Sequence, residues 1–160
     1  MEIIIDIQHG EQMLQGIQLE ELAVFTLKHE EIPDNTEVSI SFVPDEEIAQ
    51  LNAEYRGKEG PTDVLSFECD GLDDDMLLFE DDQFEVPEFA LGDIVIAPDV
   101  ALKQSADYGT TFEQEISVLL VHGLLHLCGY DHIEDEDAAI MEPLEREILS
   151  AWFGYEVSFR

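Results

Sequence analysis

Alternating apolar and polar residues mark four short segments of the chain as β-strands. In the clearest of them Val38, Ile40 and Phe42 alternate with polar neighbours, the pattern of a strand with one buried face. Strands are predicted at residues 2–7, 37–43, 63–67 and 90–97. A segment rich in glycine and proline, at residues 56–61, reads as a loop between the second and third strands.

Apolar residues at helical spacing fill most of the remaining chain. Helices are predicted at residues 17–29, 45–55, 98–109, 112–128 and 134–153. Asp45 and Thr111 are suited to cap two of these helices, and Gly129 is a natural stop for the helix at 112–128. Pro143 interrupts the last helix and indicates either a kink or a later true start. No internal repeat or linker is found, so the 160 residues predict a single domain.

The charge balance is the most unusual feature of the composition. Six basic residues face 39 acidic residues, for a formal net charge of −33. Residues 68–88 alone contain ten acidic residues and no basic one, which predicts an exposed acidic loop to which we assign no site. Such a chain repels polyanions at long range, which by itself argues against a nucleic-acid partner. It also resembles the surface of proteins adapted to high salt, and the sequence does not separate these two explanations.

Several features place the protein in the cytoplasm. Apolar residues make up 45% of the chain, as in a globular protein, yet no run reaches the roughly 20 residues of a membrane helix. The N-terminus lacks the pattern of a signal peptide. Cys69 and Cys128 are therefore expected to be free thiols. Cys128 could serve as a metal ligand, but a small buried residue on the inner face of a helix is the favoured interpretation.

Three histidines have the spacing of a metal site. His122 and His126 are four residues apart on a predicted helix, so both rings project from one face. Gly129 then ends the helix and lets the chain return, which can bring His132 to the same ion. Three histidines leave one position for water, the pattern of catalytic zinc, whose bound water has a pKa near 7. One zinc ion is predicted, although nickel and copper also suit histidine ligands.

The spacing of these histidines is also that of the metzincin proteases. Those enzymes carry a glutamate directly after the first histidine as general base. Gly123 occupies that position here, and a positioned base contributes about 10²–10⁴-fold to rate, so peptide hydrolysis is disfavoured. Asp131 could orient a ligand or cap the following helix, and Met141 is expected to pack in the core.

A second candidate site lies in the glycine loop after the second predicted helix. Arg56 and Lys58 are two of only six basic residues, separated by Gly57. The planar fork of an arginine suits phosphate, so an anion contact is one interpretation. A surface salt bridge to one of the many carboxylates is the other.

Taken together, these segments resemble the YbeY (UPF0054) family of rRNA maturation factors. The resemblance rests on residues 122–132 (HGLLHLCGYDH), 51–67 (LNAEYRGKEGPTDVLSF), 91–96 (LGDIVI) and 141–149. It implies an α+β domain with a small mixed four-stranded sheet, about five helices and a metzincin-like metal helix. It also implies His122, His126 and His132 as ligands of one zinc ion and Arg56 as the catalytic contact to RNA phosphate. Lys58 is predicted as a further substrate contact because it is paired with Arg56 on the same loop.

The activity implied by the resemblance is a single-strand-specific, metal-dependent endoribonuclease. Its members act on ribosomal RNA, notably at the 3′ end of the small-subunit RNA, and in ribosome quality control. Implied partners are single-stranded rRNA, small-subunit ribosomal proteins and an assembly GTPase. Two alternatives stay open: a metzincin-like zinc peptidase, and a non-catalytic ribosome assembly factor with a zinc site. The nucleophile, water or the ribose 2′-hydroxyl, also stays open.

Overall fold

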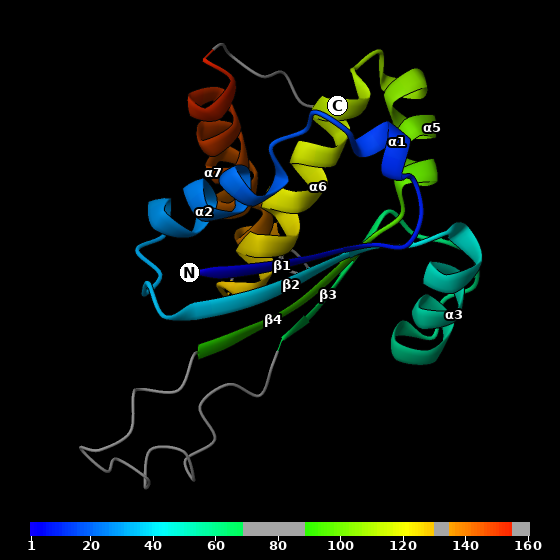
Figure 1. Cartoon of the computed structure of the whole chain (residues 1–160), viewed down its shortest axis with the longest axis horizontal. Coiled ribbons are helices and arrows are strands. Elements are labelled where there is room, and N and C mark those ends of the chain that lie inside the picture. Colours follow the sequence, from blue (N-terminus) through cyan, green and yellow to red (C-terminus); the bar gives the residue numbers. More distant parts are fainter. Residues whose placement is uncertain (69–88, 130–134, 155–160) are drawn as a thin grey trace, which may run out of the picture.

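Four strands form one mixed sheet in the computed structural model, which describes residues 1–68, 89–129 and 135–154. The strands are β1 (Glu2–Ile7), β2 (Thr36–Phe42), β3 (Val64–Glu68) and β4 (Phe89–Ile96). They lie in the order β1-β2-β4-β3, with β1, β2 and β4 parallel and β3 antiparallel to β4 (Figure 1). The expected small mixed four-stranded sheet is confirmed, and β3 forms one of its two edges.

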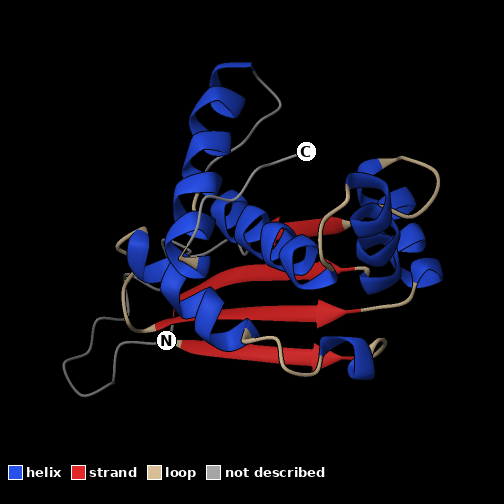
Figure 2. Ribbon diagram, turned by 90° about the horizontal axis from the view of Figure 1, so that it is seen from above, coloured by secondary structure: helices blue, strands red, loops and turns tan. Residues whose placement is uncertain are grey.

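Six helices surround this sheet in the described residues. They are α1 (Glu11–Leu14), α2 (Leu19–His29), α3 (Asp45–Arg56), α5 (Pro98–Tyr108), α6 (Phe112–Leu127) and α7 (Asp135–Phe153). Helices α2, α6 and α7 lie over one face, whereas α3 packs against the other (Figures 1 and 2). The five predicted helices are confirmed to within two residues, and the single turn α1 was not predicted. Helix α7 begins at Asp135, so Pro143 lies inside it rather than before a later start.

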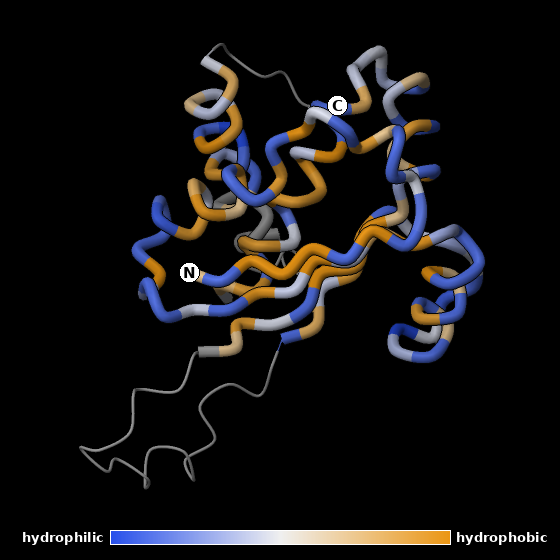
Figure 3. Tube along the Cα trace, in the orientation of Figure 1, coloured by the Kyte–Doolittle hydropathy of each residue, from blue (hydrophilic) through white to orange (hydrophobic). Residues whose placement is uncertain are grey.

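The main hydrophobic core lies between the sheet and α6. On the covered face Val38, Ile40 and Phe42 of β2 alternate with half-buried polar residues, as the sequence predicted. Figure 3 shows hydrophobic and hydrophilic residues alternating along the strands that lie below the helices. A smaller cluster on the opposite face joins Ile48 of α3 to Leu65 and Val95 of the sheet. The core thus fixes α6 on one side of β3 and α3 on the other.

Helix α6 is buried along most of its length and carries two of the three predicted histidine ligands. Its start is fixed by a capping box: the Gln114 backbone N–H donates to Thr111 Oγ1 at 3.1 Å, and the Thr111 N–H donates to Gln114 Oε1 at 3.0 Å. Gly129, with φ of 105°, follows its last residues. Both predicted helix signals are therefore confirmed.

One expectation about α3 was wrong. Pro44, in extended conformation, occupies the N-cap position, and its carbonyl accepts the N–H groups of Glu47 and Ile48. Asp45 is consequently the first helical residue and makes no capping bond. Tyr55 continues the helical spacing of Ile48 and Leu51, but its exposure of 63% shows that it lies beyond the buried stripe. None of the helices in the described ranges combines the length and apolarity needed to cross a bilayer.

Candidate metal centre and anion-binding loop

His122 and His126 face each other from adjacent turns of α6. Their Nε2 atoms are 3.0 Å apart, and their ring centroids are 4.6 Å apart at 74°. The His122 side chain is 21% exposed, so the pair reaches the surface from a mostly buried helix. The expectation that both rings share one face is confirmed. His132, the third predicted ligand, and Asp131 lie outside the described residues.

A buried carboxylate that the sequence did not predict, Glu145, accepts a hydrogen bond from His122. Glu145 of α7 accepts from His122 Nδ1 at 2.5 Å, and its side chain is only 8% exposed. A proton at Nδ1 leaves Nε2 of a neutral ring with its lone pair directed toward His126. One signal was available in the sequence, because Glu145 lies in the helical stripe formed by Met141, Ile148 and Leu149, all fully buried.

The donor set fits a divalent metal ion. Metal-binding histidines usually donate their second ring N–H to a carboxylate or carbonyl, as His122 does to Glu145. Two nitrogens on one tetrahedral zinc ion, each at about 2.0–2.1 Å, would lie about 3.4 Å apart. The observed distance of 3.0 Å between the two Nε2 atoms would need to increase only slightly to accommodate the ion. Within the described residues no cluster of three candidate ligands occurs, so a complete site needs a donor from elsewhere in the chain.

The surroundings of Gly123 explain why α6 carries no protease base at this position. A Cβ atom at this position would lie 3.0 Å from Ile94 Cγ2 and 3.2 Å from Ser66 Oγ. The Ser66 hydroxyl also donates to the Gly123 carbonyl at 3.3 Å. Position 123 therefore points into the contact between α6 and the sheet, where a glutamate side chain has no space and no access to the histidines' outer side.

The other residues considered for the site have structural roles. Met141 is fully buried in the core, as expected. Cys128 is a free thiol at the end of α6, and burial, with a smaller contribution from nearby Glu30, raises its pKa to about 12. A neutral, half-buried thiol packed against the core agrees with the favoured interpretation of Cys128 as a packing residue, although it is less buried than expected. His9 lies 2.7 Å from a carboxylate oxygen of Asp99, and His29 lies in the contact between α2 and α7.

The loop after α3 presents Arg56 and Lys58 to solvent. Gly57, with φ of 67°, turns the chain at the end of the helix. The side chain of Asn52 is buried and donates to the Gly60 carbonyl at 2.9 Å, which pins the far end of the loop. Both cations are exposed, and among the described residues neither has a carboxylate partner within ion-pair distance. The salt-bridge interpretation is therefore not supported there.

Strand β3 connects this loop to the histidine helix. Its start is anchored by Asp63, whose carboxylate accepts from the Val64 N–H at 2.8 Å and from Gln104 Nε2 at 3.2 Å. Ser66 contacts α6 on one face of the sheet, and Phe67 contacts α3 on the other. Edge strand β3 thus contacts both the histidine helix and helix α3, which ends at Arg56.

Sequence comparisons indicate the family of this chain. The sequence profile described as Endoribonuclease YbeY matches residues 6–153. Curated proteins with that name are 45% identical in Exiguobacterium sibiricum, over 82% of both chains, and 43% identical in Thermoanaerobacter pseudethanolicus, over 94% of this chain and 96% of that one. A third protein with that name, from Enterococcus faecalis, is 42% identical over 84% of this chain and 86% of that one.

A solved structure is similar in fold. The solution structure of a Thermotoga maritima protein superposes with a TM-score of 0.62 and 28% sequence identity, covering 95% of this chain and 89% of that chain. Sequence profile, curated relatives and fold agree over nearly the whole chain. The chain therefore belongs to the Endoribonuclease YbeY family.

Proposed function

We propose that this protein is a single-strand-specific, metal-dependent endoribonuclease that acts in ribosomal RNA maturation. The observation that carries the proposal is the pair of Nε2 atoms, 3.0 Å apart, with Glu145 bound behind His122. The relatives named as endoribonucleases support RNA as the substrate. By the family resemblance, we place its action at the 3′ end of the small-subunit RNA and in ribosome quality control, in the cytoplasm.

The proposed metal is one zinc ion, held by His122, His126 and His132. A zinc ion bound there would supply Lewis acidity and would lower the pKa of a coordinated water. Glu145 fixes the ring orientation of His122 and keeps its proton at Nδ1. The low exposure of Glu145 limits exchange of this hydrogen bond with water.

Arg56 is proposed to bind the scissile phosphate, and Lys58 a neighbouring one. A guanidinium group can donate two parallel hydrogen bonds to phosphate oxygens and so stabilise charge that develops during cleavage. Neither cation is neutralised by a described carboxylate, although the chain has 39 acidic residues. The cleavage products identify the nucleophile: a 2′,3′-cyclic phosphate indicates the 2′-hydroxyl, and a 5′-phosphate indicates water.

The decisive experiment is cleavage of single-stranded rRNA fragments by the intact chain, by His126→Ala and by Arg56→Ala, with zinc content measured in each. We expect His126→Ala to lose zinc and activity together. Arg56→Ala should lose about 10²-fold or more in turnover at unchanged zinc content. Equal cleavage by the intact chain and His126→Ala would overturn the proposal.

Two outcomes would point to the alternative functions. Zinc-dependent cleavage of peptides would support a peptidase, which the packing of Gly123 against the sheet argues against. Normal rRNA maturation in cells that carry all three histidine substitutions would support a non-catalytic assembly factor. Ribosomal small-subunit proteins and an assembly GTPase are the proposed partners, and co-purification with ribosomal particles would test them.

A further inference from the structure

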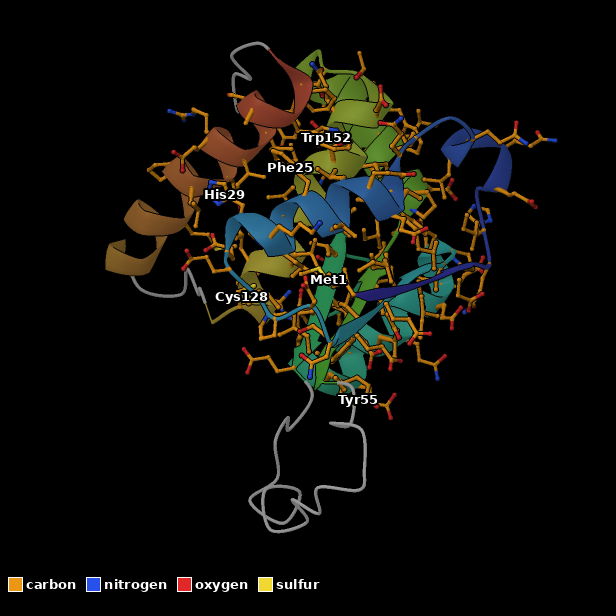
Figure 4. All side chains as sticks on the ribbon, turned by 60° about the vertical axis from the view of Figure 1, so that its left-hand side comes forward. Met1, Phe25, His29, Tyr55, Cys128 and Trp152 are labelled. Atoms are coloured by element: carbon orange, nitrogen blue, oxygen red, sulfur yellow. The ribbon has the colours of Figure 1, made fainter. Side chains whose placement is uncertain are left out.

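An aromatic pair with one exposed ring, Tyr55, comes directly before the two cations of the loop, which have no ion-pair partner among the described residues. Tyr55, at the end of α3, is 63% exposed, and its ring centroid lies 5.1 Å from that of Phe67 in an edge-to-face arrangement at 68°. Figure 4 shows Tyr55 at the rim of the molecule, far from the Phe25–Trp152 pair between α2 and α7. Arg56 follows it directly in the chain.

This tyrosine contributes little to the core. The other apolar residues of α3 progress from the fully buried Ile48 to the half-buried Leu51, and Tyr55 continues that row into solvent. Its only ring contact in the described residues is with Phe67, which also packs against the smaller hydrophobic cluster. Phe67 therefore holds the Tyr55 ring in place while most of the ring surface remains open.

Rigid aromatic rings next to cations form a common binding surface for single-stranded nucleic acid. Every base has a π-face, so stacking is tolerant of sequence, while arginine and lysine contact the phosphates. Stacking does not require the protein to be basic. A chain with net charge −33 gains little from long-range attraction to RNA, so contacts that are independent of charge become important.

We propose that Tyr55, supported by Phe67, is a base-stacking platform that binds one unpaired base of the RNA strand while Arg56 and Lys58 contact the adjoining phosphates. The proposal deepens, and rests on, the proposed endoribonuclease function. Strand β3 connects the platform to the histidine helix, because Phe67 and its neighbour Ser66 point to opposite faces of the sheet. The platform would thus hold the RNA strand next to β3, the edge of the sheet that contacts the histidine helix. Because stacking needs an open base face, the RNA bound there would have to be unpaired.

The test measures binding of a labelled single-stranded RNA by fluorescence anisotropy, in a His126→Ala background that prevents cleavage. Tyr55→Ala should raise Kd by roughly 5–100-fold, the range for loss of one stacked base. Tyr55→Phe should bind like the parent protein. Tyr108→Ala, which removes another exposed tyrosine from α5, is the matched control and should leave Kd unchanged. Thermal melting of each variant verifies that it is folded.

A second probe, an abasic oligonucleotide of the same length, separates stacking from a structural effect. The abasic oligonucleotide should bind with the same affinity to the His126→Ala protein and to the same protein that also carries Tyr55→Ala. Equal RNA affinity of Tyr55→Ala and Tyr108→Ala, or an equal loss of affinity for the abasic probe, would overturn the platform.

The same measurements distinguish this proposal from the proposed function. A Tyr55-dependent affinity in a chain that never cleaves RNA would support the platform and overturn the enzymatic proposal. Cleavage by the intact chain, with no effect of Tyr55→Ala on Kd or KM, would support the enzymatic proposal and overturn the platform. RNA binding too weak to detect in every variant, together with absent cleavage, would overturn both.

Discussion

At the scale of single residues, the candidate metal centre involves side chains that the histidine spacing alone does not reveal. Glu145 comes from a different helix, 23 positions further along the chain than His122, and reaches it only because α6 and α7 pack together. At Gly123 the helix lies so close to the side chains of Ile94 and Ser66 that a Cβ atom would come within 3.0–3.2 Å of them. Each residue supports a separate prediction.

Replacing Glu145 should weaken metal binding without removing a ligand. Loss of such a supporting carboxylate typically costs about 10–100-fold in metal affinity, and we expect that range for Glu145→Ala. Competition with a chromophoric chelator measures the zinc affinity. Glu142→Ala is the matched control, since Glu142 is an exposed carboxylate on the same helix. Unchanged zinc affinity in Glu145→Ala would show that the bond to His122 has no influence on the metal.

Introducing the protease glutamate should damage the fold rather than create a peptidase. Gly123→Glu forces a side chain into a site where even Cβ lies 3.0 Å from Ile94, and it buries a carboxyl group. Overpacking and polar burial together should lower the free energy of unfolding by at least about 2 kcal/mol. Urea denaturation gives the value, with Leu102→Glu at an exposed position of α5 as control. If Gly123→Glu and Leu102→Glu have equal free energies of unfolding, α6 can move away from the sheet at little cost.

At the scale of elements, α6 is the helix on which the candidate site is built. It packs on β3 and β4 below and against α2, α5 and α7 at its sides. Its buried length leaves only a few side chains, including the two histidines, in partial contact with solvent. The position of the histidines therefore depends on how firmly the start and the end of α6 are fixed.

The capping box should contribute measurably to this positioning. Thr111→Ala removes the acceptor of the Gln114 N–H and should lower the free energy of unfolding by about 1 kcal/mol. Gln114→Ala removes the reciprocal bond to the Thr111 N–H. Because the two bonds support each other, the double variant should lose less than the sum of the single variants. Strictly additive losses, measured by urea denaturation, would show that the two caps act independently.

At the scale of the whole molecule, the distribution of charge governs how RNA can be bound. Six basic residues are spread over 160, and only Arg56 and Lys58 lie together beside β3 in the described part of the chain. Most of the long-range field is repulsive toward RNA. Affinity must therefore come from a small number of local contacts.

RNA binding by this protein should depend only weakly on salt. Each phosphate contact to a single strand contributes about −0.7 to the slope of log K against log salt, so two cations predict a slope no steeper than about −1.4. A titration of the His126→Ala protein with labelled RNA, from low to high salt, measures it. Arg56→Gln should reduce the steepness by about 0.7. A slope of −4 or steeper would reveal cations that take part from elsewhere in the chain.

The sequence by itself determined the elements, because strand alternation, helical spacing and capping residues act over a few neighbouring positions. The four strands, the five long helices and the shared face of His122 and His126 followed from such local patterns, and the resemblance supplied the mixed sheet. Asp45 was misplaced by one position because Pro44 also suits a helix start.

Only the tertiary structure decided what meets across elements. Glu145 behind His122, the closed space at Gly123, and the exposure of Tyr55 on Phe67 all depend on packing between segments distant in sequence. Short-range patterns show which face of a helix is apolar, but they contain no information about where a neighbouring sheet ends. In this structure that edge is β3, and Tyr55 packs on Phe67 of this strand while remaining 63% exposed.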